Sequence, residues 1–228
     1  MPNSDRILLL SFNIQEGRMV LARNDPDRAR AVVVMVPGVG SGLSGMERLQ
    51  EQTESLFRKV ASGPDDDAVS VITWVDYVAP QSPREAADPA FAVAGARRLA
   101  SFLVTLPLSR PSSGPTSGSA RVSVIAHGYG GLVAGLAARD HGLQADALVL
   151  LASTGAGVDQ VGELRYKGPV FATSPDTGGD GTAAGLHGAP PDSPGFGATV
   201  LRAGPLSYRE DPVTPYVPEL RRIITGQG

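Results

Sequence analysis

The residues of this chain that could do chemistry centre on a glycine-rich turn, Ala-His-Gly-Tyr-Gly at residues 126–130. An apolar run from Arg121 precedes the turn, and small residues at helical spacing follow it. This is the layout of a nucleophile elbow, Gly-x-Ser-x-Gly between a strand and a helix, whose strained turn presents the serine above a sheet. Here Gly128 stands at the serine's position. We call residues 126–130 the Gly128 turn, and we predict an elbow without its nucleophile; the alternative is an ordinary strand–loop–helix connection.

A serine hydrolase of this layout also needs an acid and a histidine, which follow the nucleophile in that order. Asp176 is the first candidate for the acid and Asp180 the second, although a solvated aspartate in a turn explains either one equally well. The loop that should carry the histidine, residues 203–211, contains none. His187 follows Asp176 in the chain, so we keep it as a candidate for a displaced base.

Two other hydroxyls lie near this site in the sequence. We expect Tyr129 to point away from the site because it neighbours a sharp turn, and we expect Ser153 to be a polar strand end. The backbone donors of an oxyanion hole remain, namely the N–H of Tyr129 and the segment Gly38-Val39, beside a helix N-terminus that favours anions. The predicted binding residues are Gly38, Val39, His127, Gly128, Tyr129 and Asp176.

Alternating strand and helix patterns surround these residues. An N-terminal hairpin and six apolar runs predict strands at Ile7–Phe12, Arg18–Ala22, Ala31–Val36, Ala68–Val75, Arg121–Ala126, Ala147–Ala152, Val170–Ala172 and Ala198–Arg202. Helices are expected from a capping box at Ser44 and Glu47, after Asp88-Pro89, after the Gly128 turn and near Pro218. The fold class is therefore α/β: a mostly parallel sheet with helices on both faces and an antiparallel N-terminal hairpin. Ligands of such sheets bind beyond the carboxyl ends of the strands.

Composition excludes several classes of function. A length of 228 residues suits one domain spanning 1–228, with a mobile Ser/Gly/Pro loop at 109–120. The net charge of −3 argues against a nucleic-acid partner. We expect no metal, because the histidines and acids lack ligand spacing, and no cofactor, because the phosphate-binding fingerprints are incomplete. No membrane span or signal peptide is recognisable, so we expect a cytoplasmic protein.

The sequence resembles an actinobacterial α/β-hydrolase family long described as a domain of unknown function. The resemblance covers nearly the whole chain, and its most specific parts are the Gly128 turn and the pattern His187…Phe196-Gly197-Ala198. The family implies an α/β-hydrolase fold and, in intact members, ester or lipid hydrolysis by a serine triad. Its elbow has serine where this chain has Gly128, and its C-terminal histidine falls at Pro205. His187 matches a different position of the family.

These observations lead to a hypothesis of a degenerate serine esterase or lipase-like hydrolase. Two lost catalytic residues, Gly128 and Pro205, indicate natural decay of the site. We expect a protein that binds a small carbonyl or ester-like ligand, or that serves a structural role with a protein partner or a second copy. The alternative is an ester or lipid hydrolase with displaced catalytic residues, or an inactivated variant of one.

Overall fold

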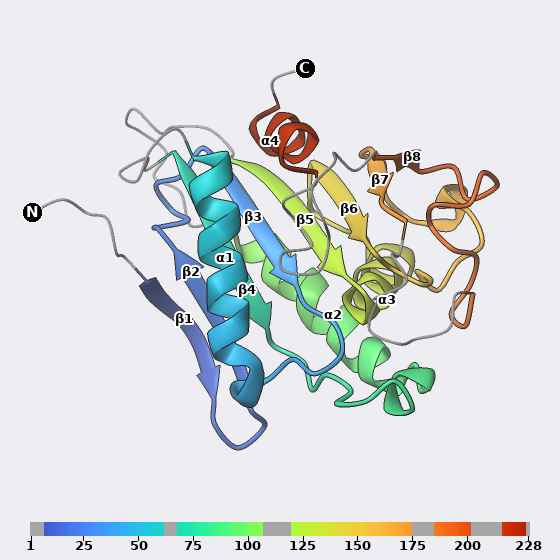
Figure 1. The fold of residues 1–228 in the computed structure, drawn as a ribbon, viewed down its shortest axis with the longest axis horizontal. Coiled ribbons are helices and arrows are strands. Elements are labelled where there is room, and N and C mark those ends of the chain that lie inside the picture. Colours follow the sequence, from blue (N-terminus) through green and yellow to red (C-terminus); the bar gives the residue numbers. More distant parts are fainter. Residues whose placement is uncertain (1–6, 62–67, 107–119, 175–184, 202–215, 227–228) are drawn as a thin grey trace, which may run out of the picture.

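The computed structural model describes residues 7–61, 68–106, 120–174, 185–201 and 216–226. Within these residues, eight strands form one sheet in the order β1-β2-β4-β3-β5-β6-β7-β8 (Figure 1). The strands are β1 (Ile7–Asn13), β2 (Arg18–Arg23), β3 (Ala31–Val36), β4 (Val69–Val75), β5 (Arg121–His127), β6 (Ala147–Leu151), β7 (Val170–Ala172) and β8 (Thr199–Val200).

Strand pairing follows the predicted pattern. Strands β1 and β2 form an antiparallel hairpin that joins β4 antiparallel, and every pair from β4 to β8 is parallel. Val36 of β3 lies opposite Ala126 of β5, Ala126 opposite Leu150 of β6, and Leu150 opposite Ala172 of β7. Four neighbouring parallel strands therefore end nearly level, at one edge of the sheet, which is where ligands of such sheets bind.

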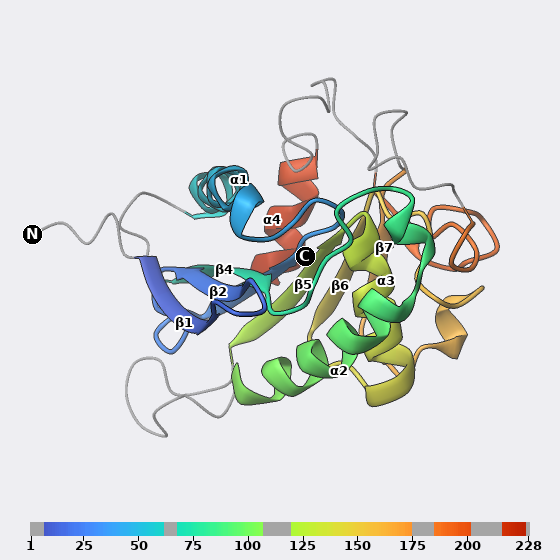
Figure 2. The same cartoon turned by 90° about the horizontal axis from the view of Figure 1, so that it is seen from below.

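Helices cover both faces of the sheet, as predicted. Helices α1 (Met46–Val60) and α4 (Val217–Thr225) lie on one face, and α2 (Ala90–Thr105) and α3 (Tyr129–Leu136) lie on the other (Figure 2). Each face has its own apolar core of buried side chains. Helix α3 continues into a π-helical turn, Ala137–His141, and ends at Gly142 with a φ of 76°. Short 3₁₀ helices occupy Leu43–Gly45, Glu85–Ala87 and Val161–Glu163.

Several local predictions were wrong. The capping box is not formed, because Ser44 belongs to the preceding 3₁₀ helix and α1 begins after Gly45 without a side-chain cap. The last strand, β8, has only two residues. The inner face of α2 combines the buried leucines Leu99 and Leu103 with small residues that include Ala92 and Gly95. A Cβ on Gly95 would lie 3.0 Å from the Tyr77 side chain, so this face needs small residues where it meets its neighbours.

One further prediction falls largely outside the described residues. The Ser/Gly/Pro loop at 109–120 lies there except for Ala120, which is buried at the start of β5. The described residues contain no helix with the length and apolar character that a membrane crossing requires.

Candidate functional site

The Gly128 turn joins β5 to helix α3 at the carboxyl edge of the sheet. Gly128 has a φ of 52° and a ψ of −122°, a left-handed conformation that glycine adopts without steric cost. Its N–H donates to the Leu151 carbonyl at 3.0 Å, and its own carbonyl accepts from the Gly131 N–H at 2.9 Å. Both sides of the turn are therefore fixed, one by strand β6 and the other by the first turn of α3.

Glycines in α3 let this helix approach the strand ends closely. A Cβ on Gly130 would lie 2.2 Å from the Val36 carbonyl oxygen, and one on Gly135 would lie 2.0 Å from the Ala156 carbonyl oxygen. A Cβ on Gly131 would meet the Ser153 hydroxyl at 2.1 Å. Since none of these distances is tolerable, glycine is required at all three positions for α3 to lie against the end of β3 and the segment that follows β6.

Hydrogen bonds also fix the loop that follows β3. The Tyr77 hydroxyl donates to the Pro37 carbonyl at 2.6 Å, and the buried Ser41 hydroxyl donates to the Gly38 carbonyl at 2.6 Å. The N–H of Gly40 donates to the Pro80 carbonyl at 2.9 Å. Because Gly130 packs against the Val36 and Pro37 carbonyls, this loop abuts the Gly128 turn. The segment Val36-Pro37, which leads into Gly38 and Val39, therefore lies against the first turn of α3 at Gly130.

Tyr129 points away from the strand edge and into the protein. Its hydroxyl donates to the Asp88 carbonyl at 2.5 Å and accepts from the Ala92 N–H at 3.2 Å, so it ties α3 to the start of α2. Burial, together with the charge of Asp88, outweighs the Ala92 hydrogen bond and raises the pKa of Tyr129 to about 12. A neutral phenol with both contacts made is poorly suited to act as a nucleophile.

We expect Tyr129→Phe to lower the free energy of unfolding by about 1–3 kcal/mol, because it leaves the Asp88 carbonyl and the Ala92 N–H without this partner. Thermal unfolding of the variant checks the loss. Tyr166→Phe is the matched control, because the buried Tyr166 hydroxyl has no hydrogen-bond partner among the described residues. The control should unfold within a degree or two of the natural chain, and an equal loss in both variants would contradict the role given to Tyr129.

His187 lies beside Tyr129, although it is far away in the sequence. The two rings meet edge to face with centroids 5.9 Å apart, and Nε2 of His187 lies 2.7 Å from the Ala86 carbonyl oxygen. The carbonyl of His187 accepts from the Gly157 N–H at 2.7 Å. These contacts fix both the loop and the imidazole, and they direct Nε2 toward the backbone next to α2.

The other predicted site residues divide into two groups. His127 is half-buried at the end of β5, and Ser153 is buried with its hydroxyl donating to the Gly155 carbonyl at 3.0 Å. Ser153 thus lies just beyond β6, which ends at Leu151. Asp176, Asp180 and Pro205 lie outside the described residues. Within the described part of the chain, no three His, Asp or Glu side chains are grouped so that they could hold a metal ion.

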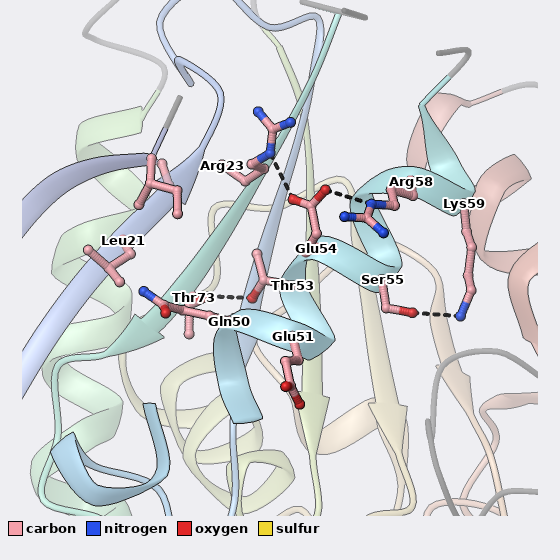
Figure 3. A pocket seen from close by; sticks show the side chains of 12 residues that line it. Leu21, Arg23, Gln50, Glu51, Thr53, Glu54, Ser55, Arg58, Lys59 and Thr73 are labelled. Carbon is pink, nitrogen blue, oxygen red and sulfur yellow. Dashed lines mark hydrogen bonds and ion pairs between the residues drawn. The ribbon is translucent and has the colours of Figure 1, made fainter. Parts of the chain in front are cut away.

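A separate cavity of about 700 Å³, which the sequence reasoning missed, lies between α1 and the β1–β2 hairpin. It borders α1, so it is on the face of the sheet opposite α3 (Figure 2). Figure 3 shows the side chains that line it. At its wall, Glu54 of α1 accepts from Arg23 of β2 and from Arg58, each at 2.8 Å. The spacing of Glu54 and Arg58, four residues apart on a helix, was the only sign of this cluster in the sequence.

The Arg23–Glu54–Arg58 cluster should make stability depend on pH. Partial burial opposes ionisation of Glu54, but the hydrogen bonds and charges of Arg23 and Arg58 outweigh it and hold the pKa of this carboxyl below its ordinary value of 4.5. The stabilisation of the folded chain by ionised Glu54 is therefore complete above pH 4.5 and is lost as the pH falls through the lowered pKa of the folded state.

We expect Glu54→Gln to lower the free energy of unfolding by about 2 kcal/mol at pH 7 and by much less at pH 3, measured by urea unfolding. Equal losses at both pH values would contradict this account. Glu47→Gln, at the exposed start of the same helix, controls for the loss of one carboxylate.

Known proteins resemble this chain in sequence and in fold. A family model described as alpha/beta hydrolase matches residues 14–177. Uncharacterized proteins from two strains of Mycobacterium tuberculosis are 29% identical over 145 residues, which is 61% of this chain and 21% of theirs. The alignment thus spans about a fifth of the length of those curated relatives.

Solved structures with the same fold are more distant in sequence. An α/β serine hydrolase without a lid from Xanthomonas campestris is 13% identical, with a TM-score of 0.52, over 99% of this chain and 94% of its own. Dienelactone hydrolase from Anabaena variabilis is 19% identical, with a TM-score of 0.45, over 75% of this chain and 74% of its own. At these identities the likeness concerns the fold alone.

Proposed function

The chain belongs to the alpha/beta hydrolase family, and we propose that it is a member that has lost its serine chemistry and now binds a ligand or a protein partner without turning it over. The observation that carries the proposal is the backbone of Gly128. Its φ of 52° and ψ of −122°, between a parallel strand and a helix, suit the strained turn on which this fold presents a nucleophile. Glycine offers no atom there that could attack a carbonyl.

The sequence supplies a second, independent loss. Where the family resemblance calls for the histidine, the chain has Pro205, which can neither take a proton from a nucleophile nor return it to a leaving group. Enzymes of this class lose nearly all their rate when either residue is removed, and the second loss adds little. Selection for catalysis would therefore have ceased to act on either position once the other had changed.

We propose that the part of the site that binds the ligand is retained. We assign the carbonyl oxygen or anion of the ligand to the backbone around Val39 and Tyr129, at the N-terminal end of α3. The fixed backbone after β3 supports this assignment, because the hydroxyls of Tyr77 and Ser41 donate to the carbonyls of Pro37 and Gly38. In this proposal, His127 and Asp176 border the ligand, and residues 1–228 act as one domain. The ligand class that fits is a small ester or another carbonyl compound.

Hydrolysis of p-nitrophenyl acetate and butyrate by the natural chain tests the loss of activity. We expect a rate equal to that of Gly128→Val, in which a branched side chain fills the position of the nucleophile. Turnover by the natural chain that His187→Ala or Asp176→Ala abolishes would overturn the proposal, because it would establish a displaced catalytic site. Thermal shift with a non-hydrolysable ketone analogue of the ester then measures binding, which the proposal expects to survive.

A further inference from the structure

The cavity beside α1 has walls of different chemistry. Ile7 of β1 and Leu21 of β2 line it on the hairpin side, whereas Gln50, Thr53 and Glu54 line it on the helix side. Figure 3 shows Leu21 across the cavity from the side chains of α1. The volume of about 700 Å³ lies within the range of roughly 300–1,000 Å³ that is typical of small-molecule sites. An apolar wall that faces a polar one indicates an amphipathic ligand.

Two buried hydroxyls in the cavity lining, those of Thr53 and Thr73, are satisfied within the protein. Thr53 donates to the Leu49 carbonyl at 2.8 Å, and its oxygen also bonds the Thr73 hydroxyl. Because the single hydroxyl hydrogen of Thr53 goes to Leu49, Thr73 donates to Thr53 in this pair. Neither threonine therefore has a hydroxyl hydrogen left for a polar ligand. The space between these threonines and Leu21 suits a hydrocarbon chain, which needs no hydrogen-bond partner.

Charge gathers at one end of the cavity, where Arg23, Glu54 and Arg58 meet (Figure 3). Two guanidinium groups share one carboxylate there, so the cluster is net positive in a chain whose net charge is −3. The other charged side chains of the lining do not alter this balance. Glu51 points away from the cluster, and Lys59 makes its hydrogen bond on the opposite flank of the helix (Figure 3). The complement of this end of the cavity is therefore an anionic group.

Arg58 is the member of this cluster that has donors to spare. Arg23 is 5% exposed and donates to Glu54 and Asn24, and its guanidinium lies 4.4 Å from the centre of the Phe57 ring. The Arg58 side chain is 74% exposed and uses Nε to bind Glu54. Its two Nη atoms have no hydrogen-bond partner among the described residues. A guanidinium with free Nη donors is well suited to bind a carboxylate through two parallel hydrogen bonds.

We propose that this cavity binds an amphipathic anion with a single hydrocarbon chain, a medium-chain carboxylate. The carboxylate pairs with the Nη atoms of Arg58, and the chain lies between Leu21 and the two threonines, toward Ile7. The buried Arg23 fixes Glu54, and Glu54 in turn orients Arg58. The cavity lies on the face of the sheet opposite α3, so this site is separate from the Gly128 turn and does not depend on the function proposed for it.

Isothermal titration calorimetry of the full chain with dodecanoate, below the concentration at which it forms micelles, tests the proposal. We expect saturable binding that is at least about 10-fold tighter than that of octanoate, because the longer chain buries more CH₂ groups. Dodecyltrimethylammonium, which has the same chain and the opposite charge, should bind at least about 10-fold more weakly than dodecanoate. An absence of dodecanoate binding, or equal binding of the cation, would overturn the proposal.

Two substitutions on α1 separate the contact made by Arg58 from a general effect of charge. Arg58→Gln should weaken dodecanoate binding at least about 10-fold, because it removes the paired donors. Arg48→Gln removes the same charge from an exposed position of the same helix outside the cavity lining, and it should bind dodecanoate as the natural chain does. An equal loss of affinity in both variants, or no loss in Arg58→Gln, would contradict the assignment of the carboxylate to Arg58.

Protection of an introduced thiol distinguishes binding in this cavity from binding at the Gly128 turn. The natural chain has no cysteine, so a single introduced cysteine is its only thiol. Gln50→Cys lies in the cavity lining, and Val104→Cys lies on α2, at the opposite face of the sheet. Saturating dodecanoate should slow the reaction of Gln50→Cys with iodoacetamide at least about 10-fold, because a bound ligand covers the lining, and should leave Val104→Cys unchanged. Slowing at neither position, or equal slowing at both, would refute the placement of the ligand.

Discussion

A double variant, Gly128→Ser with Pro205→His, should hydrolyse p-nitrophenyl acetate at least about 100-fold faster than the natural chain. Serine restores the attacking oxygen, and histidine restores the group that takes its proton. The backbone around position 128 is held by hydrogen bonds to Leu151 and Gly131, so the new side chain should adopt the strained conformation that this turn imposes. That strain is worth about 1–3 kcal/mol, so the variant should also unfold at a lower temperature.

Each single variant should remain near the background rate, because serine and histidine act as one unit and neither works alone. Gly162→Ser with Pro205→His is the matched control, since it carries the same two new side chains with the serine at a position where no atom lies within 4 Å of a Cβ. Turnover by the control would mean that the activity does not come from position 128. A folded but silent double variant would refute the assignment of Gly128 and Pro205 as the lost residues.

The Gly130→Ala variant should lose about 3 kcal/mol of stability and unfold roughly 10 °C below the natural chain. The added Cβ would lie 2.2 Å from the Val36 carbonyl oxygen and 2.8 Å from that of Pro37, and both are backbone atoms that cannot swing away. Helix α3 must then move off the end of β3 or strain the loop that leads to Gly38. Thermal unfolding followed by circular dichroism measures the loss.

Gly162→Ala is the control for this substitution, because a Cβ there meets nothing within 4 Å and glycine 162 does not have the left-handed φ that disfavours alanine. It should unfold within about 0.5 kcal/mol of the natural chain or slightly above it. If Gly130→Ala and Gly162→Ala proved equally stable, the close approach of α3 to β3 would be wrong, and with it the geometry on which the Gly128 turn depends.

The sequence predicted the arrangement of the sheet well because its parallel strands are continuous apolar runs. Ala31–Val36 is buried on both faces and matches β3 at both ends. The Gly128 turn was recognisable because glycine and alanine recur where a helix must lie close to strand ends. Gly130, Gly131 and Gly135 each meet a neighbour at a distance that excludes a Cβ.

Other features depend on contacts between distant segments, which local patterns do not encode. The capping box at Ser44 failed because a 3₁₀ helix takes that residue and delays the start of α1. The contact of the Tyr129 hydroxyl with Asp88 joins residues 41 positions apart, and that of His187 with Ala86 joins residues 101 apart. The Arg23–Glu54 ion pair likewise links a strand to a helix, so the cavity beside α1 was not foreseen. Asp176 and Pro205, which lie outside the described residues, stay predictions from the sequence.

The most direct test of the lost serine chemistry is to treat the natural chain with a fluorophosphonate, which bonds to activated serines, and to measure its intact mass. The account predicts an unchanged mass, while the Gly128→Ser, Pro205→His variant gains one adduct on Ser at position 128. An adduct on any serine of the natural chain, Ser153 included, would contradict the account, because it would mean that a nucleophile activated by a base is still present.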